Sequence, residues 1–166
     1  KRQVQNIAWS VPAMTVRDEP RFGFRGLLLD PVRCFIPKEN VLRIIDCMAR
    51  LKINTLHFHL TDDNGWRVEI KKYPRLTEVG AWRVDRTGLP FPARRNPEPG
   101  EPTPVGGFYT QEDIKEMVAY AAERQIEVVP EIDVPAHSNS ALAAYPHFAC
   151  PVVKEYIGVL PGLGGR

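Results

Sequence analysis

The chain has 166 residues, of which 43% are hydrophobic, 25% are charged and 9% are aromatic. This composition is typical of a globular domain with a hydrophobic core, and it excludes a disordered or a fibrous protein. Lys and Arg number 22 against 20 Asp and Glu, so the formal net charge is only +2. A charge this small argues against a nucleic-acid partner. We also expect no membrane span, because no apolar run approaches the roughly 18 to 20 residues that cross a bilayer.

The predicted elements alternate between strands and helices along the chain. Residues 24–30 form a short apolar run closed by Asp-Pro, which is typical of a buried strand. Apolar side chains recur at helical spacing over residues 37–52, and residues 53–60 then alternate in character as a second strand does. A capping-box pattern predicts a helix over residues 110–124, and residues 127–133 form a third strand. This order predicts an α/β fold with a parallel sheet.

Prolines and glycines mark the irregular parts of the chain. Residues 86–107 hold six prolines and four glycines, which neither a helix nor an inner strand accommodates. We therefore expect a long Pro-rich loop there, which serves as a lid or an insertion. A short helix is expected over residues 139–145, ended by Pro146. Pro130 conflicts with the third strand, because proline removes a backbone donor.

Polar side chains follow each predicted strand at its carboxyl end. Asp30 and Arg33 follow the first strand, Asp62 follows the second, and Asp133 and His137 follow the third. Because the carboxyl ends of parallel strands meet at one edge of a sheet, we expect these side chains to lie together. Although Arg33 could be an ordinary surface charge, an arginine balanced by carboxylates can present its planar fork to sugar hydroxyls.

Two kinds of catalytic site remain open on these residues alone. Imidazoles and carboxylates at one edge can hold zinc, so the first is a metal-dependent hydrolase that uses His57, His59, Asp62, His137 and Asp133. The absence of a His-Glu-x-x-His motif or another tight ligand spacing argues against it.

The second kind of site is a metal-free carbohydrate site. Trp66 follows the second strand and could stack on a sugar ring, although most such aromatic side chains belong to the core. His57 and His59 share a strand face, and the simpler interpretation of them is as buried, hydrogen-bonded core residues. A sugar-binding fragment without catalysis stays open as a third class.

Several long motifs in the chain resemble the β-N-acetylhexosaminidases of glycoside hydrolase family 20. They are FRGLLLDPVR at 24–33, LHFHLTDDNGWR at 56–67, GFYT at 107–110 and PEIDVPAH at 130–137. The resemblance covers roughly residues 20–150 and implies a (β/α)₈ barrel that removes terminal N-acetylglucosamine or N-acetylgalactosamine from glycans. The chain would form the first three or so β/α units of this barrel.

The resemblance also implies roles for individual residues. Arg33 would hold the ring hydroxyls of the terminal sugar, and Asp133 would orient Arg33. Asp62 and His137 would form the pair that supports and tunes the general acid. The His57-x-His59 pair matches the strand motif of the family, which favours a structural role over zinc. The implied mechanism is substrate-assisted, because the acetamido oxygen of the sugar attacks the anomeric carbon.

The family has an adjacent Asp-Glu pair at the end of its fourth strand, which orients the acetamido group and supplies the general acid. This chain has Asp-Glu only at Asp18-Glu19, before the first strand. We therefore expect residues 1–21 to be a lead-in from a preceding domain. Residues 22–166 would be the N-terminal portion of the barrel, inactive alone. The implied partners are a terminal N-acetylhexosamine and the rest of the catalytic domain, with no metal or cofactor, in a secreted, periplasmic or lysosomal setting.

Overall fold

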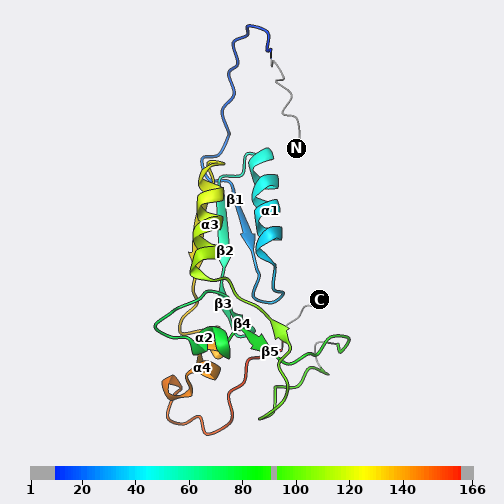
Figure 1. The fold of residues 1–166 in the computed structure, drawn as a ribbon, viewed down its shortest axis with the longest axis vertical. Coiled ribbons are helices and arrows are strands. Elements are labelled where there is room, and N and C mark those ends of the chain that lie inside the picture. Colours follow the sequence, from blue (N-terminus) through cyan, green and yellow to red (C-terminus); the bar gives the residue numbers. More distant parts are fainter. Residues whose placement is uncertain (1–9, 91–92, 162–166) are drawn as a thin grey trace, which may run out of the picture.

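The computed structural model describes residues 10–90 and 93–161. Its centre is a three-stranded parallel sheet in the order β1-β2-β7. Helices α1 and α3 lie against one face of this sheet (Figure 1). The bounds are β1 (Gly26–Leu29), α1 (Lys38–Arg50), β2 (Thr55–His59), α3 (Gln111–Ala122) and β7 (Glu127–Glu131). The predicted parallel α/β arrangement is therefore confirmed, with each element within a few residues of its expected bounds.

The hydrophobic core lies between the sheet and the two helices. Ile45 and Met48 of α1 and Met117 of α3 are almost wholly buried, and they pack on Leu56 and Phe58 of β2. Burial of an apolar side chain of this size stabilises the fold by about 1.5–3 kcal/mol. The alternation predicted for β2 is the reason for this geometry, since its apolar side chains all point to the helices.

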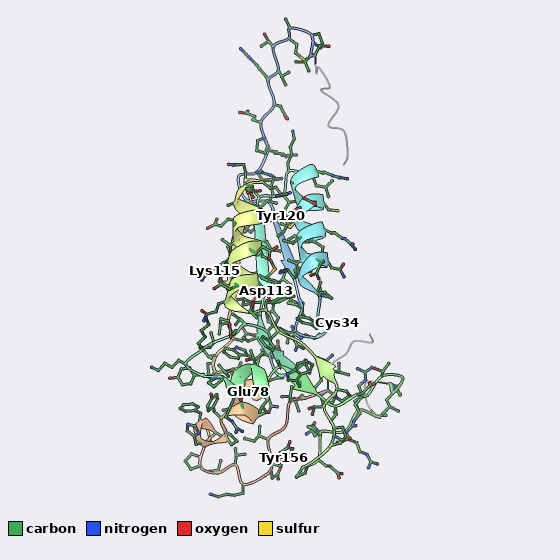
Figure 2. All side chains as sticks on the ribbon, viewed as in Figure 1. Cys34, Glu78, Asp113, Lys115, Tyr120 and Tyr156 are labelled. Carbon is green, nitrogen blue, oxygen red and sulfur yellow. The ribbon has the colours of Figure 1, made fainter. Side chains whose placement is uncertain are left out.

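An ion pair and a hydrogen bond connect α1 to α3, one toward each end of the two helices. At one end the Nζ of Lys38 lies 2.8 Å from the Oδ1 of Asp113, and at the other the hydroxyl of Tyr120 donates to the carboxylate of Asp46 at 2.9 Å. Figure 2 labels Asp113 and Tyr120 on opposite halves of α3. The predicted capping box is present, because Thr110 Oγ1 accepts from the Asp113 amide while the Asp113 carboxylate accepts from the Thr110 amide.

Short elements gather beyond the carboxyl ends of β1 and β2, in the lower half of Figure 1. They form two antiparallel pairs, β3-β4 and β5-β6, and two short α-helices. The predicted Pro-rich loop connects β5 to β6. The bounds are β3 (Thr61–Asp62), β4 (Gly65–Trp66), α2 (Arg75–Glu78), β5 (Trp82–Arg83), β6 (Val105–Gly106), α4 (Asn139–Ala144) and η2 (Pro146–Phe148). The expected helix over 139–145 is thus confirmed as α4.

The face of the sheet opposite α1 and α3 is partly open among the described residues. Leu28 of β1 and Val129 of β7 are 55% and 42% exposed, and both lie in register with His57 of β2. Pro130 causes no conflict in β7, because Glu127 donates to the Asn54 carbonyl and Glu131 accepts from the Leu60 amide, so the odd-numbered residues of β7 face β2 and residue 130 faces away. The missing donor of Pro130 points to the open edge, where proline is tolerated.

Residues 10–21 of the predicted lead-in are exposed and form neither helix nor strand, and they run away from the sheet (Figure 1). The rest of the lead-in, residues 1–9, lies outside the described residues. Asp18 pairs with Lys52, which follows α1 and precedes β2. The lead-in therefore contacts the amino end of the sheet. Among the described helices, none is long and apolar enough to cross a membrane.

Candidate functional site

Asp62 is the centre of the site, because it is 2% exposed and contacts an arginine and a histidine from other strand ends. Its Oδ2 lies 2.6 Å from Arg33 Nη2, and its Oδ1 lies 3.3 Å from His137 Nδ1. Arg33 follows β1, Asp62 ends β3 directly after β2, and His137 follows β7. The structure thus brings together the three side chains that the strand-end pattern placed at one edge of the sheet.

The guanidinium of Arg33 is held from several sides and still reaches solvent. Its Nη1 donates to Asp30 Oδ2 at 2.9 Å and lies 2.9 Å from His59 Nε2. The other oxygen of Asp30 accepts from the backbone amides of Val32 and Arg33, so the turn after β1 is fixed by the same carboxylate. The side chain of Arg33 remains 33% exposed. A preoriented, partly exposed fork of this kind can bind a hydroxylated ligand.

Asp133 does not hold Arg33 in the way that the sequence implied. Among the described residues Arg33 forms ion pairs with Asp30 and Asp62, and none with Asp133. The Asp133 amide instead donates to Thr61 Oγ1 at 2.9 Å. Asp30 forms this contact because it is only three residues from Arg33 and faces the guanidinium.

His137 is half-exposed and lies between two carboxylates. Its Nδ1 is 3.3 Å from Asp62 Oδ1 and 3.3 Å from Asp63 Oδ2. The negative charge of Asp62 is the main cause that raises the pKa of His137 above its ordinary value, with partial burial acting in the opposite direction and Asp63 adding to the rise. This direction agrees with the predicted pairing of Asp62 with His137. The ring can therefore carry a proton near neutral pH.

His57 and His59 differ in their surroundings, although both point to the same face of β2. His59 is buried and contacts the site directly, since its Nε2 lies 3.0 Å from Asp62 Oδ2. The side chain of His57 is 40% exposed, so the expectation of a buried residue is wrong for it. Both rings contact the carboxylate of Glu131, which lies opposite His59 in the register of β7.

Glu131 is a site residue that the sequence reasoning missed. The period of two along a strand could have indicated it. Residues 129 and 131 lie on one face of their strand, and in the paired sheet this is the face that carries the two histidines of the neighbouring strand.

Two groups of side chains could offer three ligand atoms to a metal ion within the described residues. They are His59 with Asp62 and Asp133, and Asp62 with Asp63 and His137. Neither group contains His57, so the structure does not gather the five candidate ligands of the zinc alternative. Both groups depend on Asp62, whose Oδ2 already contacts the guanidinium of Arg33. A cation there would face a fixed positive charge, which weakens metal binding.

Two buried arginines hold the turn after β1, and the sequence reasoning missed both. Arg67 is 0% exposed and donates to the carbonyl oxygens of Val32 (2.6 Å) and Pro31 (3.1 Å). Arg83 is 3% exposed and donates to the carbonyl oxygen of Arg33 at 2.6 Å. Burial lowers the pKa of Arg67 to about 10, which leaves it charged at neutral pH. Composition gives little signal for such residues, because arginine is rarely buried.

Trp66 lies in a second core cluster rather than on the edge where Arg33 lies. It is 9% exposed, packs with Leu76 and Ala144, and donates its indole N–H to the carbonyl oxygen of Val68 at 2.7 Å. A ring buried in this way has little face left for stacking on a sugar.

Comparison with known proteins identifies close relatives of the chain. The family described as glycosyl hydrolase family 20, catalytic domain, matches residues 22–159. The chain is 48% identical over 144 residues to a beta-hexosaminidase of Porphyromonas gingivalis, and 50% identical over 139 residues to one of Vibrio furnissii. These matches cover 87% and 83% of the chain but 17% and 22% of the relatives. The chain therefore spans about a fifth of the length of these relatives.

Solved structures give the same result for the fold. The chain superposes on an exo beta-N-acetylglucosaminidase of Vibrio harveyi, solved with N-acetylglucosamine, with a TM-score of 0.70 and 41% identity. It superposes on the N-acetyl-beta-hexosaminidase of Streptomyces plicatus with a TM-score of 0.69 and 41% identity. The matches cover 86% and 87% of this chain but 23% and 26% of those chains. The sheet with its two helices thus corresponds to part of a barrel enzyme, which confirms the prediction of a partial (β/α)₈ barrel.

Proposed function

The chain belongs to glycosyl hydrolase family 20, and we propose that it supplies the sugar-holding part of a β-N-acetylhexosaminidase active site. The ligand would be a terminal N-acetylhexosamine of a glycan. The observation that carries this proposal is the contiguous set Arg33, Asp62 and His137, in which one buried carboxylate joins a fixed guanidinium to a titratable ring.

Arg33 would bind the hydroxyl groups of the sugar ring. Its guanidinium is partly exposed, and its contacts with Asp30 and Asp62 hold it in one orientation before a ligand arrives. Preorganisation of this kind reduces the entropy that is lost when a ligand binds. A neutral polyhydroxylated ligand suits the group, because its hydroxyls accept from the fork without altering the charge balance.

Asp62 and His137 would support the general acid of the reaction. A ring whose pKa is raised by a carboxylate can hold a proton and can donate a hydrogen bond to a neighbouring carboxyl group. In the substrate-assisted mechanism the acetamido oxygen attacks the anomeric carbon, and the general acid protonates the leaving oxygen. No protein nucleophile is needed in that scheme.

The acidic pair of the family would come from sequence other than this chain. The single Asp-Glu of the chain is Asp18-Glu19, and Asp18 pairs with Lys52 at the amino end of the sheet. Arg33 lies at the carboxyl end of the sheet. The two ends are separated by the length of a strand such as β2, which has five residues at about 3.3 Å per residue. We therefore propose residues 22–166 as the N-terminal portion of the barrel and residues 1–21 as its lead-in. The rest of the catalytic domain would be the protein partner.

The test is a titration of the chain with N-acetylglucosamine, followed in ¹H–¹⁵N spectra. We expect saturable shifts of the signals of His59 and His137, and we expect Arg33→Ala to abolish them. Arg43→Ala is the matched control, since Arg43 lies exposed on α1. Equal binding by the chain with Arg33→Ala would refute the proposal.

Catalysis provides a second measurement on the same chain. We expect no turnover of a chromogenic N-acetylglucosaminide, because general acid catalysis contributes about 10² to 10⁴ in rate and its group is missing. Turnover that disappears with Arg33→Ala would show that the catalytic carboxylates are misassigned. Chelation with EDTA should leave sugar binding unchanged, whereas its loss would favour the metal alternative.

A further inference from the structure

We propose that Glu131 is a positioning residue, which holds the proton of His59 on Nδ1 and so turns the lone pair of Nε2 toward Arg33. The effect on Arg33 matters for sugar binding only if the proposed function is correct. The protonation pattern of His59 is independent of any ligand.

The first step concerns the carboxylate of Glu131. Its Oε2 is fully buried and finds no hydrogen-bond donor of suitable geometry among the described residues. It lies 3.2 Å from His59 Nδ1 and also contacts His57 Nε2. Because buried oxygens are almost always hydrogen-bonded, both ring nitrogens should carry a proton that points at this atom.

The charge of Glu131 supports the same conclusion. Burial acts to raise the pKa of Glu131, but the contacts with His59 and His57, through hydrogen bonding and through charge, outweigh burial and lower it below its ordinary value. Glu131 is therefore an ionised acceptor at neutral pH, and it favours a proton on the nitrogen that faces it.

The second step concerns the other nitrogen of His59. Nε2 has two neighbours, Arg33 Nη1 at 2.9 Å and Asp62 Oδ2 at 3.0 Å. A guanidinium can only donate and a carboxylate can only accept, so a single state of Nε2 suits one neighbour and not the other. A neutral ring carries one proton. With that proton on Nδ1 against Glu131, Nε2 has a lone pair and accepts from Arg33.

The arrangement fixes Arg33 through three acceptors. With His59 in this form, Arg33 Nη1 donates to Asp30 and to His59 Nε2, and Arg33 Nη2 pairs with Asp62. Without an acceptor at residue 131 the proton of His59 can move to Nε2, where it donates to Asp62. Nε2 then presents a proton to Arg33 Nη1, and the guanidinium loses one of its three supports. Glu131 would thus act on Arg33 across two side chains without touching a ligand.

Two variants separate a hydrogen-bonding role of Glu131 from a packing role. Two-bond ¹H–¹⁵N spectra of the chain report which nitrogen of each histidine carries the proton, and the four histidines are assigned by single replacements. We expect His59 in the Nδ1–H form. Glu131→Gln retains an oxygen that accepts from Nδ1 and should keep that form. Glu131→Leu has a similar volume without an acceptor, and it should convert His59 to the Nε2–H form.

Glu127→Leu is the matched control, because Glu127 lies exposed in the same strand and should leave His59 unchanged. Observation of His59 as the Nε2–H form, or as an imidazolium with both protons, in the unsubstituted chain overturns the proposal. So does an Nδ1–H form that persists in Glu131→Leu.

Sugar binding is measured separately. Loss of one support of Arg33 should weaken N-acetylglucosamine binding about five- to tenfold in Glu131→Leu, as expected for one hydrogen bond. If the tautomer changes and the sugar does not bind even to the unsubstituted chain, the proposed function fails while this inference stands. Unchanged affinity in a chain that binds sugar and has converted His59 would refute the link from Glu131 to Arg33.

Discussion

Replacement of Arg67 by methionine should both destabilise the chain and disorganise the site. The guanidinium is fully buried, and within the part of the chain that the structure describes it forms no ion pair with a carboxylate. It is solvated instead by carbonyl oxygens from four segments, at Pro31 and Val32, at Asn64, at Ala81, and at Gly107. Methionine is apolar and of similar length, so the substitution fills the space and removes every hydrogen-bond donor of the guanidinium.

The expected loss in the free energy of unfolding depends on which of these carbonyl oxygens keep a hydrogen-bond donor when Arg67 is replaced. Val32 O and Asn64 O each still accept from Arg83 Nη1 at 3.1 Å, and Ala81 O still accepts from the Gly107 amide at 3.3 Å. Pro31 O and Gly107 O lose the bond that Arg67 supplied. A buried polar group without a partner costs about 1–3 kcal/mol. Two such groups give a loss of about 4 kcal/mol in the free energy of unfolding.

Urea denaturation followed by circular dichroism measures this loss. In thermal unfolding of a chain of this size, a loss of about 4 kcal/mol corresponds to a fall in Tm of about 8–16 °C. Arg43→Met is the control, since Arg43 is exposed on α1 and such substitutions usually change stability by less than about 0.5 kcal/mol. A loss for Arg67→Met no larger than that of the control would refute the view that Arg67 holds these four segments together.

Three smaller predictions concern single contacts. The NMR titration midpoint of His137 should lie above its ordinary value and should fall in Asp62→Asn. Because the pKa of His137 is raised in the folded chain, the stabilisation from this pair is complete below the unfolded pKa and is lost as the pH rises through the folded pKa. Gly106→Ala should lower stability by about 3 kcal/mol in urea denaturation, because a Cβ would lie 2.0 Å from the carbonyl oxygen of Ala81, while Gly23→Ala meets nothing within 4 Å. Thr110→Ala removes the cap of α3 and should cost about 1 kcal/mol in the same assay.

The main sheet and its helices were predictable because their signals are long and regular. In β2 the alternation of Leu56 and Phe58 with His57 and His59 separates a helix-covered face from an open one, and this needs no tertiary information. The pairs β3-β4 and β5-β6 have two residues per strand, too few for any period to be recognised. These elements exist because the backbone is fastened by long-range contacts such as those of Arg67.

The site was predictable to the extent that it follows strand ends. Arg33, Asp62 and His137 were found because each follows a different parallel strand, and the rule that such ends converge is geometric. Asp133 also follows a strand, but the closer carboxylate of Asp30 takes the contact with Arg33. Asp30 is three residues from Arg33 in the sequence, so a local turn is enough to bring its carboxylate to the guanidinium, whereas Asp133 would need the tertiary fold to do so.

The charges of the site favour a neutral ligand over an ionic one. The fixed cation is Arg33, and its nearest anions are Asp30 and Asp62, so the negative charge at the guanidinium already exceeds the positive charge. An anionic ligand would have to displace one of these carboxylates, and His137 is itself held between Asp62 and Asp63. A metal cation would meet the guanidinium at Asp62. A sugar hydroxyl meets neither obstacle, because it can accept from an exposed N–H of Arg33 while the ion pairs remain intact.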